Sequence, residues 1–182
     1  MGHDTAGTMI PMVRLETVLD TWKTVRNDTV QALEDFPAHE LDFKPVADVA
    51  SLGEIARHIL DSSHALTGML LDGLEDLSGP NFRALIDKYR PSLPEKPDAA
   101  TLARELRKSV EQRTSQLAAR DAAFFAHIIT RFDGQRVTRL EMLQMVKEHE
   151  LAHSQQLFMY LRLKGIVPVT TRRRLAMQQA QR

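Results

Sequence analysis

Two histidines and a glutamate in the C-terminal part of the chain have the spacing H-E-x-x-H. His149, Glu150 and His153 lie within the stretch KEHELAHSQQLFMYLRLKG. Residues four apart share one face of a helix, so the two imidazoles could bind one divalent ion while the glutamate activates water. Because zinc proteases carry this pattern, peptide hydrolysis is the first hypothesis to test.

The residues that follow the motif argue against a protease. Such an enzyme needs a third metal ligand downstream, either a glutamate or a histidine six residues after the second histidine. Met159 occupies that sixth position, and the segment from Ser154 to Arg182 contains no Asp, Glu, His or Cys. The pattern of the chain also predicts no sheet on which a peptide substrate could bind as an added strand. We therefore look for a different metal chemistry.

A third ligand, if there is one, must come from upstream, and His58 is the best candidate. It lies in SLGEIARHILDSSH beside Ile55 and Ile59, on or next to an apolar stripe that faces other helices. Three neutral imidazoles around a divalent ion leave a position for water or substrate, which is typical of a catalytic site. The alternative is that these histidines are simply hydrogen-bonded near the core, and spacing alone leaves it open.

The other titratable residues near the motif are harder to assign. Glu150 lies about 100° round the helix from His149, and we interpret it as a helix-surface charge in preference to a general base. Glu148 and Glu54 are either acceptors that orient a histidine or solvated residues. His64 lies about 240° round the helix from His58, so the two cannot face one ion. Three further histidines lack any partner spacing: His3, His39 and His127.

Helical periodicity predicts the elements that must position these residues. Apolar residues three or four apart indicate helices over four ranges, and Ser51 with Glu54 has the spacing of a capping box before the second. Several prolines between the second and third ranges predict a long crossover with room for a short helix at 81–89. The expected fold is all-α, a four-helix bundle with one long crossover between helices 2 and 3. The four ranges are 12–36, 52–72, 98–119 and 138–164. Three methionines of the last range are expected to fill the core: Met142, Met145 and Met159.

Composition sets limits on the class of protein. The 182 residues contain 24 Lys plus Arg, 24 Asp plus Glu and no Cys. We expect one domain over 1–182, with a core of about 12–168 and a basic tail over 169–182 that is solvated or flanks a dimer. The balanced charge makes nucleic acid an unfavoured partner, despite the arginines at 172–174. No segment has the roughly 20 apolar residues of a membrane span, and the start of the chain lacks a signal peptide, so a cytoplasmic location is expected.

Two stretches of the sequence resemble the DinB/YfiT-like family of metal-binding four-helix bundles. Leu41, Phe43 and Pro45 match the family's L…F…P phrase before the second helix and its histidine, which is His58 here. The family's last helix typically reads E-H-E-x-H-H-x-G-Q-L, followed by Y-L-R-x-x-G and a proline. The matching residues are Glu148, His149, Glu150, His153, Gln156, Leu157, Tyr160, Leu161, Arg162, Gly165 and Pro168. Ala152 and Gln155 depart from the pattern, but the three histidines remain intact.

This resemblance implies a function as well as a fold. It implies a divalent metal ion, zinc or nickel, bound by His58, His149 and His153. The family includes transferases that join low-molecular-weight thiols to electrophiles, so it implies a thiol S-transferase or hydrolase-like enzyme with a small-molecule thiol or electrophile as partner. It also implies a homodimer. The alternative that stays open is a stress-related metal-binding dimer without catalytic activity. The sequence names neither the native metal nor the thiol.

Overall fold

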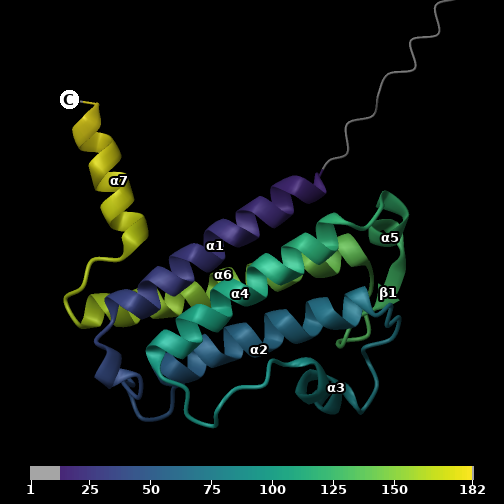
Figure 1. The fold of residues 1–182 in the computed structure, drawn as a ribbon, viewed down its shortest axis with the longest axis horizontal. Helices are drawn as coiled ribbons and strands as arrows, with labels where there is room; N and C mark the ends of the chain where they lie inside the picture. Colours follow the sequence, from purple (N-terminus) through teal and green to yellow (C-terminus); the bar gives the residue numbers. More distant parts are fainter. Residues whose placement is uncertain (1–12, 182) are drawn as a thin grey trace, which may run out of the picture.

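Four long helices form the body of the molecule. The structure is a computed structural model that describes residues 13–181, so expectations that rest on His3, Met12 or the possible targeting segment concern residues outside this range. The long helices begin and end within three residues of the predicted positions, and the short helix α3 (Phe82–Tyr89) lies in the predicted crossover (Figure 1). They are α1 (Leu15–Asp35), α2 (Leu52–Leu71), α4 (Ala99–Ala118) and α6 (Arg139–Leu163).

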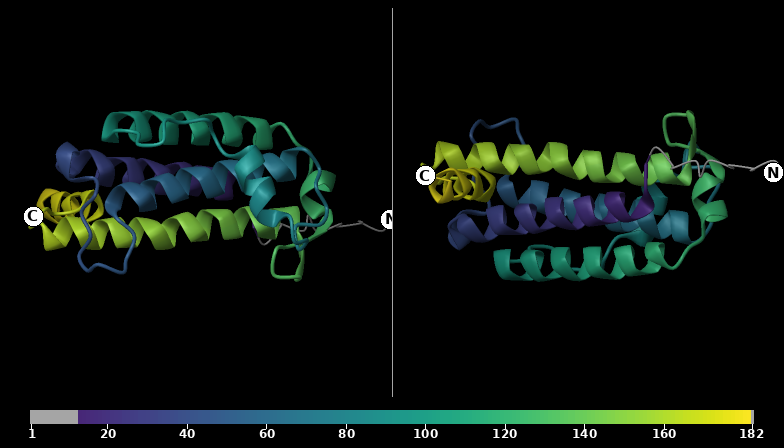
Figure 2. Two further views of the ribbon diagram at one scale, coloured as in Figure 1. Left: turned by 90° about the horizontal axis from the view of Figure 1, so that it is seen from below. Right: turned by 90° about the horizontal axis from the view of Figure 1, so that it is seen from above.

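The packing of these helices confirms an all-α four-helix bundle with one long crossover. Both α1 and α2 pack along α4 and α6, whereas α1 and α2 touch each other little, so they occupy diagonal corners (Figure 2). The crossover from α2 to α4 carries α3 along the outer side of α2 (Figure 1). As a result α2 is covered on the bundle side by α4 and α6 and on the other side by α3.

Two capping boxes begin the helices that carry the candidate ligands. At α2 the Ser51 N–H donates to Glu54 Oε2 over 2.6 Å, and the Glu54 N–H donates to Ser51 Oγ over 3.2 Å. The Ser51 amide, followed by Lys44, holds the pKa of Glu54 below its usual value. Thr138 and Glu141 make the same reciprocal contacts at α6. Glu54 is therefore a capping residue and does not orient a histidine.

A buried polar layer divides the core into two apolar clusters. One cluster includes Leu33 and Leu157, and the other includes Trp22 and Val146. Met142 is fully buried as predicted, but the prediction that Met159 fills the core is wrong, because its side chain is 54% exposed. Between the clusters lie buried polar residues from all four long helices. Arg26, Thr29, Ser63, Glu150 and Ser154 are joined by hydrogen bonds, and Ser109 contacts His64.

A small hairpin near the start of α6 was not predicted. Strand β1 (Ile128–Thr130) pairs antiparallel with β2 (Arg136–Thr138), after the one-turn helix α5 (Ala122–Ala126). Three-residue strands are too short to show the alternation on which a strand prediction depends. The Thr130 N–H donates to Glu75 O over 2.7 Å, and Thr130 O accepts from the Leu77 N–H over 2.8 Å, so the hairpin is joined to the crossover.

The basic tail forms helix α7 (Val169–Ala180), which extends away from the bundle (Figure 1). Two of its arginines pair with carboxylates of α1, since Arg172 lies 2.7 Å from Asp35 and Arg173 lies 2.6 Å from Asp28. Most of the helix is exposed, as expected of a solvated or dimer-flanking segment. No helix among residues 13–181 combines the length and apolar composition that a membrane crossing requires.

Candidate metal centre

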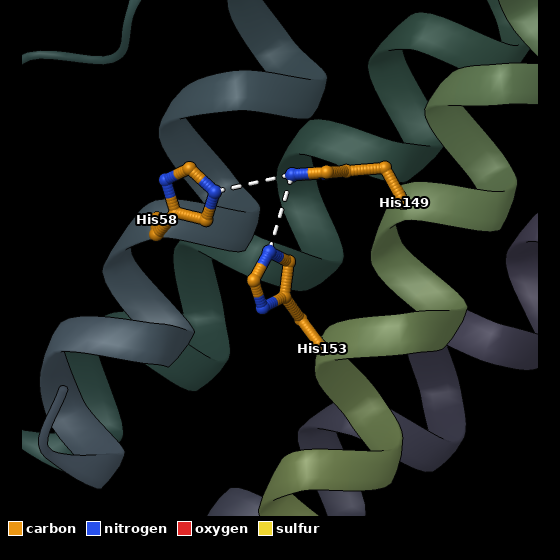
Figure 3. A group of neighbouring side chains, drawn as sticks. All are labelled: His58, His149 and His153. Atoms are coloured by element: carbon orange, nitrogen blue, oxygen red, sulfur yellow. Dashed lines mark hydrogen bonds between the residues drawn. The ribbon is translucent and has the colours of Figure 1, made fainter. Parts of the chain in front are cut away.

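The three histidines singled out in the sequence meet between α2 and α6. His149 Nε2 lies 3.1 Å from His58 Nε2 and 3.2 Å from His153 Nε2, and the three rings point toward one another (Figure 3). His149 and His153 come from successive turns of α6, and His58 faces them from α2. As the i, i+4 spacing predicts, His149 and His153 lie on the same face of α6. Because α1 and α2 occupy diagonal corners of the bundle, α2 lies beside α6.

The hydrogen bonding of this cluster is compatible with a cation at its centre. His153 Nδ1 lies 2.7 Å from Gln156 Oε1, an acceptor to which it can donate, and Nε2 of the same ring is aimed at the cluster. A proton on His149 Nε2 can be donated in a hydrogen bond to only one of its two neighbours, His58 Nε2 or His153 Nε2. Burial, followed by His153 and His58, lowers the pKa of His149 to about 4, so its imidazole is neutral at pH 7 and free to act as a ligand.

The spacing of the three nitrogens fits a small divalent ion. Imidazole nitrogens bind zinc at about 2.0–2.1 Å, so tetrahedral angles separate them by about 3.3 Å. The separations of His149 Nε2 from His58 Nε2 and from His153 Nε2, 3.1 and 3.2 Å, are close to that value. Within residues 13–181 these three histidines form the one group of His, Cys, Asp or Glu side chains whose ligand atoms lie close enough together, within 4.8 Å of one another, to hold one ion. The residues present therefore fit the ion that the sequence predicts.

The cluster opens onto a groove of about 700 Å³. The groove runs along α2 beneath α3 and the rest of the crossover, with His58 and His149 in its wall and Met145 one turn before His149 on α6. His58 is the most exposed of the three histidines. A ligand in the groove can therefore approach the cluster from the side of His58 and His149.

The interpretation of Glu150 as a surface charge is wrong. Its side chain is completely buried and faces α1, where both carboxylate oxygens are held. The Trp22 Nε1–H donates to Oε2 over 2.6 Å, and Arg26 donates through Nε to Oε1 over 2.5 Å and through Nη2 to Oε2 over 2.8 Å. Glu150 does not line the groove. It cannot serve as the general base of a zinc protease, which agrees with the argument against peptide hydrolysis.

The buried Glu150 network supports the histidines from behind. Glu150 is the next residue after His149, so fixing its carboxylate against α1 also fixes the rotation of this turn of α6. Ser154, next to His153, shares a hydrogen bond of 2.5 Å with Thr29 of α1. Each α6 histidine is therefore followed by a residue that is anchored to α1, so the polar layer holds the two turns of α6 from which the rings project. Glu148, in contrast, is exposed and accepts a hydrogen bond from Gln144.

The other three histidines within residues 13–181 lie apart from the cluster, as expected. His39 and His127 are exposed beside Glu40 and Glu75. His64 points toward α4, where its Nδ1 lies 2.9 Å from Ser109 Oγ. Burial, followed by the positive charge of Arg113, lowers the pKa of His64 to about 4. His64 therefore joins two helices as a neutral ring.

His64 should make the fold sensitive to mild acid. Its ordinary pKa of 6.5 falls to about 4 on folding, so between these values the unfolded chain binds the extra proton and acid destabilises the native state. The stabilising effect is complete above about pH 6.5 and is lost as the pH falls toward 4. We expect the free energy of unfolding of the His64→Gln variant to fall less steeply over this interval, as measured by urea denaturation. The His39→Gln variant, altered at an 83% exposed side chain, should keep the wild-type slope; equal slopes in all three proteins would contradict this assignment.

Comparison with known proteins agrees with this architecture. The model of the DinB superfamily matches residues 21–157. The uncharacterised protein YjoA of Bacillus subtilis (strain 168) is 25% identical over 154 residues, which cover 85% of this chain and 93% of YjoA. The crystal structure of the DinB-like YjoA aligns with a TM-score of 0.65 at 22% identity, over 82% of this chain and 92% of that one.

Two further solved structures share the fold. YfiT of Bacillus subtilis, described as a probable metal-dependent hydrolase with an unusual four-helix bundle topology, aligns with a TM-score of 0.62 at 16% identity, over 87% of this chain and 92% of its own. A mycothiol-dependent maleylpyruvate isomerase aligns with a TM-score of 0.62 at 15% identity, over 80% of this chain and 61% of the isomerase. At these identities the two structures establish the fold alone.

Proposed function

The chain belongs to the DinB superfamily, and from this premise we propose that it binds a divalent metal ion through His58, His149 and His153 and transfers a low-molecular-weight thiol to an electrophile. The observation that carries the proposal is the convergence of three Nε2 atoms, two pairs of them 3.1 and 3.2 Å apart, at the wall of an open groove. Zinc and nickel are the ions proposed, since both accept imidazole ligands.

The chemistry divides between the ion and the chain. A bound divalent ion lowers the pKa of a coordinated thiol, so that a thiolate is present at neutral pH. In the transfer the thiol proton is released to solvent, the sulfur forms a bond to the electrophilic carbon, and the leaving group departs with the electron pair of its broken bond. The three histidines would hold the ion at the wall of the groove, the groove would align the two substrates, and the Glu150 network would keep the turns of α6 that carry two of the ligands in place.

Proteins of the same fold support metal dependence and the use of a thiol in general terms. One structural neighbour is described as metal-dependent and another as mycothiol-dependent. The chain contains no cysteine, so a substrate must supply the sulfur. The alternative is a stress-related metal-binding dimer without catalytic activity, in which the same histidines hold an ion that no substrate approaches.

A thiol-consumption assay separates these two functions. We expect zinc- or nickel-loaded protein to accelerate the loss of free thiol from a panel of bacterial low-molecular-weight thiols in the presence of a simple electrophile. Chelated protein and the His149→Ala variant should return to the uncatalysed rate, while the His39→Ala variant keeps the wild-type rate. Equal rates for all four samples across the panel would favour the non-catalytic alternative. Metal-dependent cleavage of casein would instead restore the protease hypothesis, which we expect to fail.

We also propose that the protein is a homodimer. Several large apolar side chains are exposed on α6 and on the segment that follows it: Leu151, Met159, Leu163, Val167, Leu175 and Met177. Three of them, at 151, 159 and 163, are separated by multiples of four and so lie along one side of α6. A second copy of the chain could cover this surface about a two-fold axis, which is the commonest symmetry of soluble oligomers.

Light scattering at micromolar concentration measures the oligomeric state. We expect the mass of a dimer for the wild-type protein and a shift toward the monomer for the Met159→Glu variant, because a charge would be buried in the interface. The Glu111→Gln variant changes an exposed side chain on α4, which does not pack against α6, and should remain dimeric. A monomeric wild-type protein would contradict the proposal.

A further inference from the structure

The two ends of the groove differ in chemistry. The groove follows α2 from Gly53 to Leu66, which is about 20 Å at the helical rise per residue, and the histidines lie between these ends. The Gly53 end is mostly polar and the Leu66 end is mostly apolar. The polar end is lined by Asp42, Ser51, Glu54, Glu95 and Lys96, with Leu41, Pro97 and Leu102 beside them, and the apolar end by Leu66, Phe82, Ile86, Phe132 and Met145, with Arg83 and Asp87 beside them.

The apolar end contains an aromatic pair assembled from two distant segments. Phe82 of α3 stacks on Phe132 of the hairpin turn, with ring centroids 5.2 Å apart and an interplanar angle of 30°. Phe132 is 42% exposed, although it is a large apolar residue in the groove wall. The hydrogen bonds between Thr130 and the crossover hold the hairpin in place beside α3. This end of the groove therefore presents a fixed apolar surface to a ligand.

Arg83 is the arginine of this groove that has no carboxylate partner. Arg57 pairs with Asp61 over 2.8 Å, and Arg90 lies 3.3 Å from Asp87 and 4.0 Å from Asp61. Arg83 also lines the groove, next to Phe82, but within residues 13–181 it makes neither an ion pair nor a side-chain hydrogen bond. A guanidinium in this state offers paired N–H donors to a carboxylate of a bound ligand.

The position of Arg83 relates this charge to the candidate metal centre. Arg83 follows Phe82 on α3 and lines the same groove as His58 and His149. A carboxylate held by Arg83 would therefore lie in the groove onto which the candidate metal centre opens.

We infer that the Leu66 end of the groove binds the electrophilic substrate, and that this substrate has an apolar or aromatic body and a carboxylate held by Arg83. This inference rests on the proposed function, because it assigns one end of the groove to one of the two substrates. The hydrophilic thiol then occupies the polar end, and the two reactants meet at the histidines. Arg83 is the specificity-determining residue for the carboxylate, and Phe82 and Phe132 contact the apolar body.

Binding of two matched probes tests this assignment without requiring catalysis. The probes are cinnamate and its neutral amide, cinnamamide, which have the same aromatic body and differ in the anionic group. Affinities are measured by ligand-observed NMR titration at fixed ionic strength, with a chelator present so that the carboxylate cannot bind a metal ion. We expect cinnamate to bind on the order of tenfold more tightly than cinnamamide, the effect of a charge-assisted hydrogen bond at a partly exposed site.

Three variants locate the effect. The Arg83→Gln variant should lose the preference for cinnamate and keep the wild-type affinity for cinnamamide. The Arg174→Gln variant removes the same charge from the exposed helix α7, outside the groove, and should keep the preference. The Phe132→Ala variant should weaken both probes by a similar factor. In zinc-loaded protein Arg83→Gln should reduce the affinity for cinnamate by the same factor as in chelated protein.

Several outcomes would overturn the inference. They are equal binding of the two probes to the wild-type protein, a preference that survives Arg83→Gln, probe affinities unchanged by Phe132→Ala, or no binding of either probe at millimolar concentration. None of these results depends on thiol transfer, since the titration uses chelated protein. A chain that transfers thiols without any carboxylate preference would therefore refute this inference alone, and a chain that shows the preference without catalysis would refute the proposed function alone.

Discussion

The Glu150→Ala variant should be strongly destabilised, by about 3–5 kcal/mol in the free energy of unfolding. That is the usual cost of removing one partner of a buried ion pair, because the other charge remains buried without compensation. Arg26 is 0% exposed and would keep only its contacts to Leu106 O and Ser63 Oγ. Trp22 would lose the acceptor for its indole N–H. Urea denaturation followed by circular dichroism gives the measurement.

The Glu148→Ala variant is the matched control for this experiment. Glu148 lies on the same helix two residues away, but its side chain is exposed and bonded only to Gln144. Surface substitutions of this kind change stability by less than about 0.5 kcal/mol. The double variant Arg26→Met/Glu150→Leu should lose less free energy of unfolding than Arg26→Met and Glu150→Leu lose in sum, because the two charges interact. Glu150→Ala and Glu148→Ala proteins of equal stability would show that the buried network does not hold α1 against α6.

The His149→Ala variant should reduce the affinity for zinc by more than about 100-fold. Hydrogen-bonding partners of metal ligands are already worth about 10–100-fold, and His149 is the residue whose Nε2 lies within 3.2 Å of both other histidines. Removing it leaves two imidazoles on different helices. Zinc affinity is measured by competition with a chromophoric chelator. The His39→Ala variant, altered at an exposed imidazole outside the cluster, should bind zinc as the wild type does; equal affinities in both variants would contradict the assignment of the ligands.

The sequence predicted the elements whose ends carry local signals. Ser51 with Glu54 marked the start of α2, and an apolar residue at every third or fourth position defined the four long helices. The i, i+4 spacing of His149 and His153 placed two candidate ligands on one face of α6. His58 is the best upstream candidate because it lies beside an apolar stripe. The resemblance to a known family strengthens that choice, because no local pattern states that α2 and α6 are neighbours while α1 and α2 are diagonal.

The burial of Glu150 could not be read from its own helix. Its partners, Trp22 and Arg26, are more than 120 residues away in the sequence and approach it through the packing of α1 on α6. A signal was nevertheless present. Arg26 follows Trp22 by four residues and so lies on the apolar stripe of the first helix, where a charge needs a buried partner. The search for that partner would have led to a carboxylate on a facing helix.

The sequence of the hairpin also contains a turn signal, which an analysis of apolar periodicity alone does not detect. Asp133 and Gly134 form an Asp-Gly pair between short β-branched stretches, which is typical of a tight hairpin turn. Gly134 has a φ of 81°, a conformation that glycine adopts without steric cost. This turn places Phe132 in the groove wall, so a three-residue strand pair contributes directly to the proposed binding surface.

The metal content of the native protein tests the central claim most directly. Protein purified without a metal-affinity step would be analysed by elemental mass spectrometry, beside a variant in which His58, His149 and His153 are all alanine. We expect about one equivalent of divalent metal per wild-type chain, as a single three-histidine site requires, and a trace amount in the triple variant. Equal metal content in the two proteins, or a wild-type protein that takes up no zinc or nickel when either is supplied, would contradict the account.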